Sequence, residues 1–259
     1  MTSMPISLCI PTADRYRLFL SKALPVYLRI PQITEVIIVD ENGNDKAAIE
    51  TDFAEDVASG RLRLFENDRR LGAFKNKLKA ISLAKNDWVC VFDSDNMLSK
   101  EYFTAFEAHA AKKPLDPSTI YCPAYALANY KPHENFDFTH LLNKKIDKQF
   151  IQKTAADNFS RIEILLNTGN YILHKSVLEF PYEKFEKQIK SCRGYDVIFF
   201  NYLMTFHKGY TLQVVSNMKY NHAVHDGSYF LNTYKIKETQ DFYDELCQLI
   251  VQKEKEEDA

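Results

Sequence analysis

The sequence lacks the features that define several large classes of protein. No apolar run reaches the roughly 20 residues that a transmembrane helix needs. Residues 1–5 (MTSMP) do not resemble a secretory signal peptide. The formal net charge is −2, so no excess of basic residues favours nucleic acid. We therefore expect neither a transmembrane segment nor a nucleic-acid partner.

Cysteine is scarce and scattered. The chain has five cysteines, an odd number, and no pair has the spacing of a metal site. Cys9 and Cys90 fall inside predicted strands, where a thiol acts as a small apolar side chain. A reducing, cytoplasmic location is the default expectation.

Internal repeats and linker-like stretches are also missing, so we expect the 259 residues to form a single domain. Strands are predicted at 6–10, 36–39, 62–65 and 88–93, and helices at 15–28, 71–83 and 100–111. Beyond residue 111 the pattern is less regular, with strands near 119–122, 167–173 and 211–215 and helices at 195–206 and 239–253. Strands that alternate with helices predict an α/β fold with a mostly parallel central sheet flanked by helices.

Two carboxylates stand at the end of an apolar strand, in the run Trp88-Val89-Cys90-Val91-Phe92-Asp93-Ser94-Asp95. On an extended backbone the spacing i, i+2 points both side chains to the same side. Adjacent carboxylates repel each other, so a divalent cation is their natural partner. Open α/β sheets bind ligands at the carboxyl ends of their strands. This motif therefore predicts a site for a metal ion and a diphosphate.

From Ile6 to His222 the chain resembles the GT-A glycosyltransferases, and family 2 in particular. In the first half, the resemblance is carried by a first strand that ends in Pro11-Thr12, a second strand that ends in Asp40, and the Asp93-Ser94-Asp95 motif after a helix. In the second half, it is carried by Gly194-Tyr195-Asp196 at a helix start and by Gly209-Tyr210, which leads into a strand and then Tyr220-Asn221-His222. The resemblance implies a Rossmann-like nucleotide-diphospho-sugar transferase fold. Residues 1–98 would form the nucleotide-binding half, 99–238 the acceptor-binding half, and 239–259 a C-terminal helix and tail.

The resemblance implies a nucleotide-sugar donor, with UDP as the default nucleotide. The donor-binding residues it implies are Pro11, Thr12, Asp40, Gly72, Lys75, Asn76, Asp93 and Ser94. Asp40 would contact the base or ribose, although an aspartate at this point could also simply start a turn. The family commonly has Ala-Arg-Asn at the donor-binding helix; here the spacing differs and Lys75 is the cation. Arg69, Arg70 and Lys77 are further candidates for a phosphate contact.

The resemblance also implies a metal site for Mn²⁺ or Mg²⁺. Asp95 would bind the metal directly, and Asp93 would contact the ribose or a metal-bound water. His222 falls where the family often places a third ligand, and His225 is close enough to compete for that role. A histidine ligand suits Mn²⁺ better than Mg²⁺.

Asp196 is the candidate catalytic base, because inverting members place a carboxylate at this helix start to deprotonate the acceptor hydroxyl. The family more often has Glu-Asp where this chain has Tyr195-Asp196. An aspartate here could also cap the helix. Thr168-Gly169-Asn170 resembles the family's turn on the acceptor side.

The predicted function is thus a metal-dependent, inverting transfer of a sugar to a glycan or other hydroxyl acceptor. One alternative is a haloacid-dehalogenase-like phosphatase with Asp93 as nucleophile and Asp95 as acid. That motif usually has Thr or Val where this chain has Met97, and no second carboxylate pair at a strand end follows. Another alternative is a domain that binds a nucleotide sugar or glycan without turnover.

Overall fold

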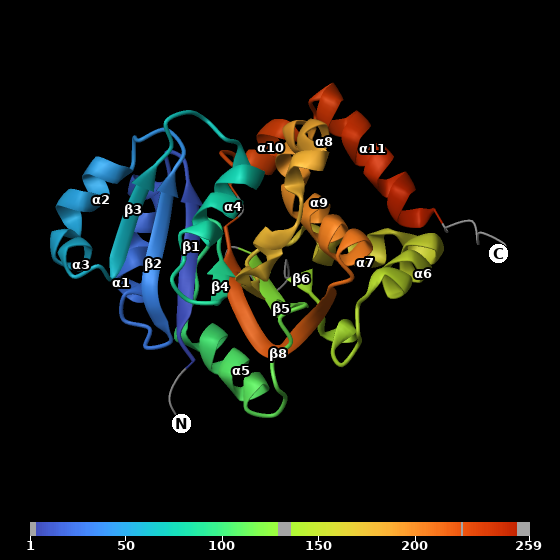
Figure 1. Cartoon of the computed structure of the whole chain (residues 1–259), viewed down its shortest axis with the longest axis horizontal. Coiled ribbons are helices and arrows are strands. Elements are labelled where there is room, and N and C mark those ends of the chain that lie inside the picture. Colours follow the sequence, from blue (N-terminus) through green and yellow to red (C-terminus); the bar gives the residue numbers. More distant parts are fainter. Residues whose placement is uncertain (1–3, 129–135, 224, 253–259) are drawn as a thin grey trace.

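The computed structural model describes residues 4–128, 136–223 and 225–252. Among these residues, eight strands form one sheet in the order β3-β2-β1-β4-β7-β5-β6, with β8 also paired to β5 (Figure 1). The strands are β1 (Ile6–Thr12), β2 (Ile33–Asp40), β3 (Leu62–Glu66), β4 (Trp88–Val91), β5 (Thr119–Ala128), β6 (Phe136–Asp137), β7 (Ile172–His174) and β8 (Thr211–His222). Only β6 and β7 run antiparallel to their neighbours. The predicted α/β fold with a mostly parallel sheet is confirmed.

Helices cover both faces of the sheet. They are α1 (Ser21–Tyr27), α2 (Lys46–Asp52), α3 (Ala54–Ala58), α4 (Ala73–Ser82), α5 (Lys100–Ala110), α6 (Lys148–Asn158), α7 (Ser160–Asn167), α8 (Glu186–Ser191), α9 (Asp196–Tyr202), α10 (Tyr229–Thr233) and α11 (Lys237–Val251). The core on one face includes side chains of α1 and α5, and the core on the other includes side chains of α4, α7 and α9. In Figure 1, α4 lies in front of the sheet and α6, α7 and α9 lie together on the right.

The central strands supply apolar side chains to both cores. Leu8 and Ile10 of β1 pack on the α1 and α5 side, and Cys9 between them packs on the α4 side. In β2, Ile37 packs on the α4 side and Ile38 packs on the α1 and α5 side. Because successive side chains of a strand point to opposite faces, a strand covered on both sides reads as one continuous apolar run. This explains why these strands were easy to predict.

The structure differs from the sequence prediction in several places, among them α6, α7, α8 and α10, which were not predicted. Helices α2 and α3 were not predicted, because they are short and only Ile49 of α2 is buried among their residues. The helix expected over 15–28 is a π-helical turn at Tyr16–Leu20 followed by α1, which contains Pro25. Strands β5 and β8 extend well beyond the predicted 119–122 and 211–215.

The length of β8 matters for the site. Parallel pairing with β5 runs from Thr119 opposite Thr211 to Ala128 opposite His222. The end of β8 then meets the segment after β4, where Met97 and Asn221 exchange backbone hydrogen bonds of 2.9 Å. The long strand therefore brings the histidine region beside the Asp93-Ser94-Asp95 motif.

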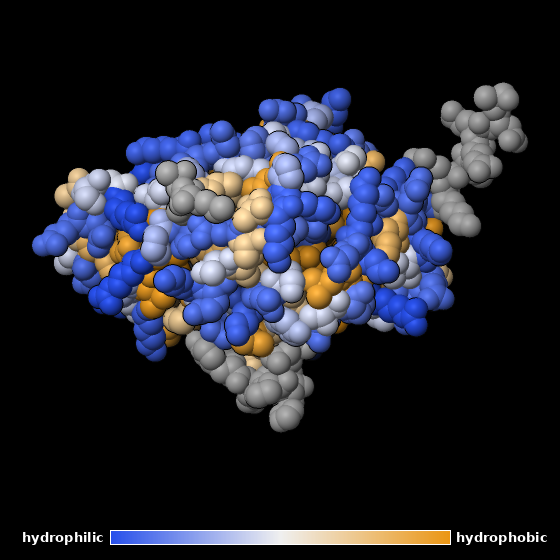
Figure 2. Space-filling model, turned by 90° about the horizontal axis from the view of Figure 1, so that it is seen from below, coloured by the Kyte–Doolittle hydropathy of each residue, from blue (hydrophilic) through white to orange (hydrophobic). Residues whose placement is uncertain are grey.

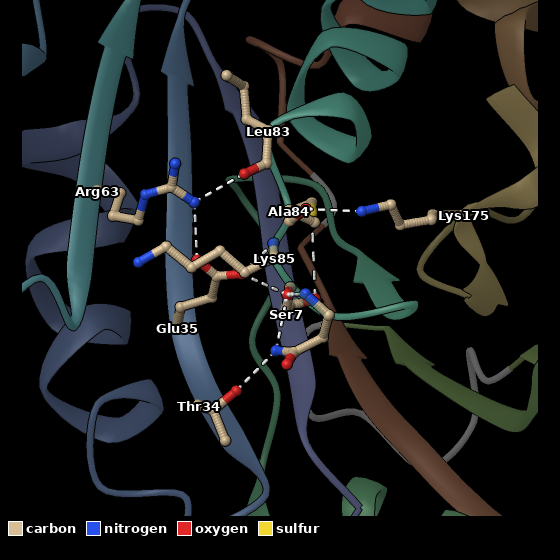
Figure 3. A network of polar contacts seen from close by, with 10 residues as sticks. Ser7, Thr34, Glu35, Arg63, Leu83, Ala84, Lys85 and Lys175 are labelled. Carbon is tan, nitrogen blue, oxygen red and sulfur yellow. Dashed lines mark hydrogen bonds and ion pairs between the residues drawn. The ribbon is translucent and has the colours of Figure 1, made fainter.

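A buried carboxylate joins the strands at their amino-terminal ends (Figure 3). Glu35 of β2 accepts hydrogen bonds from Ser7 Oγ at 2.6 Å and from the Lys85 backbone N–H at 2.6 Å. It also accepts one from Arg63 Nη1 at 2.8 Å. Burial alone would raise the pKa of Glu35, but these hydrogen bonds and the Arg63 charge lower it. Glu35 thus links β1, β2, β3 and the segment before β4.

Hydrophilic side chains dominate the face shown in Figure 2, and hydrophobic ones form separate patches between them. None of the helices in the described part of the chain combines the length and the apolarity that crossing a bilayer requires.

Candidate active site

A cleft of about 770 Å³ opens where β1, β2 and β4 end. Its lining includes Pro11 and Thr12 at the end of β1, and Asp93, Ser94 and Asp95 after β4. The carboxyl ends of parallel strands are where open α/β sheets bind ligands. The structure therefore places the predicted motif in a cleft at the carboxyl ends of the strands.

Backbone hydrogen bonds fix the motif after β4. The N–H of Phe92 donates to the Cys9 carbonyl at 2.9 Å, and the N–H of Asp93 donates to Asn170 Oδ1 at 2.8 Å. Asn170 has a positive φ of 70°, a conformation that asparagine tolerates better than most residues. Its own carbonyl accepts a hydrogen bond of 2.5 Å from the Tyr102 hydroxyl. The Thr168-Gly169-Asn170 turn thus holds the metal-binding candidate in place.

One lysine joins two carboxylates in the cleft. Lys77 Nζ lies 3.2 Å from Asp93 Oδ1 and 2.8 Å from Asp196 Oδ2. Burial alone would lower the pKa of Lys77, but the charges of Asp196 and Asp93 raise it above its ordinary value. The lysine is therefore a fixed cation that ties α4 to the segment after β4 and to the start of α9.

Asp196 is the first residue of α9 and is only 6% exposed. Burial raises its pKa, and Lys77 offsets part of that increase. Its side chain lines the cleft with Asp93 and Asp95. A carboxylate in this position can accept a proton from a bound hydroxyl.

The two candidate histidine ligands lie differently relative to the Asp93-Ser94-Asp95 motif. His225 Nε2 lies 3.1 Å from Asp95 Oδ2, and the His225 ring packs 4.8 Å from the Phe19 ring. His222 also lines the cleft, but its Nδ1 lies 3.4 Å from the Tyr220 hydroxyl. Burial lowers the pKa of His222, although Asp93 and Asp95 raise it in part. Of the two histidines, His225 contacts the motif.

Within residues 4–128, 136–223 and 225–252, no three His, Cys, Asp or Glu side chains gather closely enough to hold a metal ion. Lys77 forms an ion pair with Asp93, whereas Asp95 Oδ2 and His225 Nε2, two candidate metal ligands, lie 3.1 Å apart. Two ligands at right angles on an octahedral ion, each at about 2.1 Å, are about 3 Å apart. The separation of Asp95 and His225 fits that arrangement.

Most of the predicted donor-binding residues line the cleft, and two do not. Those in the lining are Pro11, Thr12, Gly72, Asn76, Asp93 and Ser94. Gly72 has a φ of 81° at the start of α4, a conformation that favours glycine. Asn76 is buried and donates to the Val39 carbonyl at 3.1 Å.

Asp40 lies beneath the cleft and does not line it. It is fully buried, and its carboxylate accepts backbone hydrogen bonds from Asn42, Asp45 and Lys46 at 3.3, 2.8 and 2.9 Å. These bonds stabilise the turn that leads into α2. Asp40 therefore has the turn-forming role that the sequence left open beside a contact with the base or ribose. The next residue, Glu41, faces the cleft and accepts the Gly72 N–H at 2.6 Å.

Lys75 points away from the cleft. Its Nζ lies 2.7 Å from both carboxylate oxygens of Glu186. The basic residues that do line the cleft are Arg15, Arg70 and Lys77. Arg15 and Glu41 carry no recognisable motif in the sequence, and their only signal is that they follow shortly after the ends of β1 and β2.

Comparison with known proteins agrees with this geometry. The sequence profile described as Glycosyl transferase family 2 matches residues 7–179. No curated protein matches the sequence significantly.

Solved structures share the fold at low sequence identity. The structure of Staphylococcus aureus TarS 1–349 in complex with UDP-GlcNAc has a TM-score of 0.65 and 17% identity, over 95% of this chain and 65% of that one. The TarS 1–349 structure without a named ligand has a TM-score of 0.63 and 14% identity, and 64% of it is covered. GalNAc-T7 with UDP, GalNAc and Mn²⁺ has a TM-score of 0.56 and 13% identity, over 93% of this chain and 50% of that one.

The chain spans less than two thirds of TarS 1–349, at 65%, and half of the GalNAc-T7 chain. The match to the family profile covers well over half of the chain, and both the sheet and the cleft agree with the expected GT-A architecture. The chain therefore belongs to glycosyl transferase family 2.

Proposed function

We propose that this chain transfers a sugar from a nucleotide-diphosphate donor, with a UDP-sugar favoured, to a hydroxyl group of a glycan or other acceptor. The observation that carries the proposal is that Asp95, Asp93 and Asp196 line one cleft at the strand ends. The UDP-GlcNAc complex of TarS and the UDP complex of GalNAc-T7 support this class of donor.

A divalent metal, Mn²⁺ or Mg²⁺, would be held by Asp95 and His225, with donor phosphates and water completing its coordination. When bound, the metal supplies positive charge that stabilises the departing diphosphate. The Mn²⁺ in the GalNAc-T7 structure supports this choice. Arg70 and Arg15 add positive charge to the same cleft.

Asp196 would act as the base in an inverting reaction. Its carboxylate takes the proton of the acceptor hydroxyl as the acceptor oxygen bonds to the anomeric carbon. The bond between that carbon and the diphosphate breaks at the same time, so the nucleotide diphosphate leaves from the opposite face. The hydrogen bond from Lys77 holds the Asp196 carboxylate toward the cleft before the acceptor binds.

The match to the glycosyl transferase family 2 profile supports this function over the phosphatase alternative. A domain without turnover would not need a buried carboxylate such as Asp196 within the same cleft. The cytoplasmic location and the division into halves at residues 98 and 238 stay predictions.

Thermal unfolding with UDP, GDP, CDP or TDP, each with Mn²⁺ or EDTA, tests the donor and the metal. At 100 times the dissociation constant a ligand stabilises the native state by about 2.7 kcal/mol. We expect UDP with Mn²⁺ to raise the melting temperature by about 5–10 °C, and EDTA to remove the increase.

The Asp95→Ala variant should lose this increase, because it removes one of the two proposed ligands. Asp244→Ala, at an exposed position of α11, is the matched control and should keep it. A folded wild-type protein that no nucleotide stabilises would contradict the proposed function. Hydrolysis of p-nitrophenyl phosphate would then favour the phosphatase.

A further inference from the structure

Exposed apolar side chains concentrate at the cleft. Nine large hydrophobic residues are exposed in the described part of the chain, and four of them line the cleft. These four are Ile164 of α7 (47% exposed) and Tyr229, Phe230 and Leu231 of α10 (44%, 37% and 43%). We refer to them as the apolar rim. Apolar side chains that gather around a hollow usually mark a binding surface.

Close packing holds α10 in position. A Cβ added at Gly194 would lie 2.7 Å from Thr233 Oγ1 and 3.1 Å from Phe230 Cα, so only glycine allows this approach. The Phe230 ring meets the Tyr195 ring edge-on, with centroids 5.6 Å apart. Arg15 donates a hydrogen bond to the Gly227 carbonyl, just before α10. The exposed residues of the rim are thus fixed by packing beneath them.

The apolar rim lies next to the start of α9, where the candidate base stands. Tyr195, which contacts Phe230, directly precedes Asp196. Tyr229 and Asp196 also line the same cleft.

We infer that the apolar rim binds an alkyl chain of an amphipathic acceptor, next to the hydroxyl group that faces Asp196. This inference rests on the proposed function. Aromatic faces alone would also suit a sugar ring, but Ile164 and Leu231 offer neither a π-face nor a hydrogen bond. A sugar hydroxyl placed against them would lose its contact with water without compensation. An alkyl chain instead gains by leaving water.

Octyl glucoside and methyl glucoside are suitable probes, because they differ only in the alkyl chain. Saturation-transfer NMR on the wild-type protein with UDP and the diamagnetic ion Mg²⁺, below the micelle concentration, gives both affinities. We expect octyl glucoside to bind about tenfold more tightly or better. The Leu231→Ser variant should lose most of that preference, and Ile164→Ser should weaken it.

Leu249→Ser is the matched control, because Leu249 has 40% exposure on α11 and does not line the cleft. It should keep the full preference. Equal binding of the two glucosides, or equal losses in Leu231→Ser and Leu249→Ser, would overturn the inference. Stabilisation by UDP with Mn²⁺, measured separately on the wild type, shows in either case whether the proposed donor site stands.

Discussion

Replacing Asp196 by asparagine should lower the turnover number by about 10²–10⁴-fold, the usual contribution of a general base. Asparagine has almost the same shape, so the packing at the start of α9 should persist, but its amide cannot take the proton of the acceptor hydroxyl. The rate of UDP release from a UDP-sugar in the presence of acceptor measures the effect.

Two observations separate the loss of a base from the loss of a fold. Asp196→Asn should still be stabilised by UDP with Mn²⁺, because Asp95 and His225 are untouched. Asp244→Asn, at an exposed position of α11, should release UDP at the wild-type rate. If Asp196→Asn turned over within threefold of the wild type, Asp196 would not be the base.

The pH profile offers an independent check of Asp196. A base acts only when ionised, so the rate should fall as pH drops through its pKa. Because burial raises the pKa of Asp196, this acidic limb should lie above the ordinary value for aspartate, about 3.9. A profile of kcat/KM without an acidic limb above that pH would argue against the assignment.

The Glu35→Ala variant should lose about 3 kcal/mol of the free energy of unfolding at pH 7. The glutamate side chain is 5% exposed, and its removal leaves Arg63, Ser7 and a backbone N–H without their shared acceptor. Urea unfolding measures the loss. Glu245→Ala, at an exposed position of α11, should change the stability by less than about 0.5 kcal/mol.

The sign of the pH dependence follows from the lowered pKa of Glu35. A carboxyl group whose pKa is lower in the folded protein stabilises it above the unfolded pKa, which is near 4.5. That stabilisation is lost as pH falls through the folded pKa. The difference between the wild type and Glu35→Ala should therefore shrink in acid, and a difference that stayed constant down to pH 3 would contradict this account.

The sequence by itself determined the fold class and the position of the motif. The apolar runs in β1, β2 and β4 are local signals, because a strand buried on both faces must be apolar throughout. Asp93 and Asp95 could be placed at a sheet edge because the strand before them ends abruptly. Helices α2 and α3 escaped prediction because helices of seven and five residues carry too little periodicity.

Only the tertiary structure decided which residue of each local pair faces the cleft. Lys75 and Lys77 are two residues apart on α4, so they point about 200° apart around the helix axis. Sequence spacing does not tell which of the two lysines faces the cleft. In the structure Lys77 pairs with Asp196 in the cleft, and Lys75 pairs with Glu186 outside it.

The same holds for Asp40 against Glu41. The Asp40 carboxylate accepts hydrogen bonds from three backbone N–H groups of a turn. His222 and His225 both line the cleft, and only the tertiary structure shows that His225 contacts Asp95. His225 reaches Asp95 because β8 pairs along its length with β5. Local patterns are set by neighbours in the chain and can be read from it. A binding site is set by contacts between residues more than a hundred positions apart, which form only when the sheet assembles.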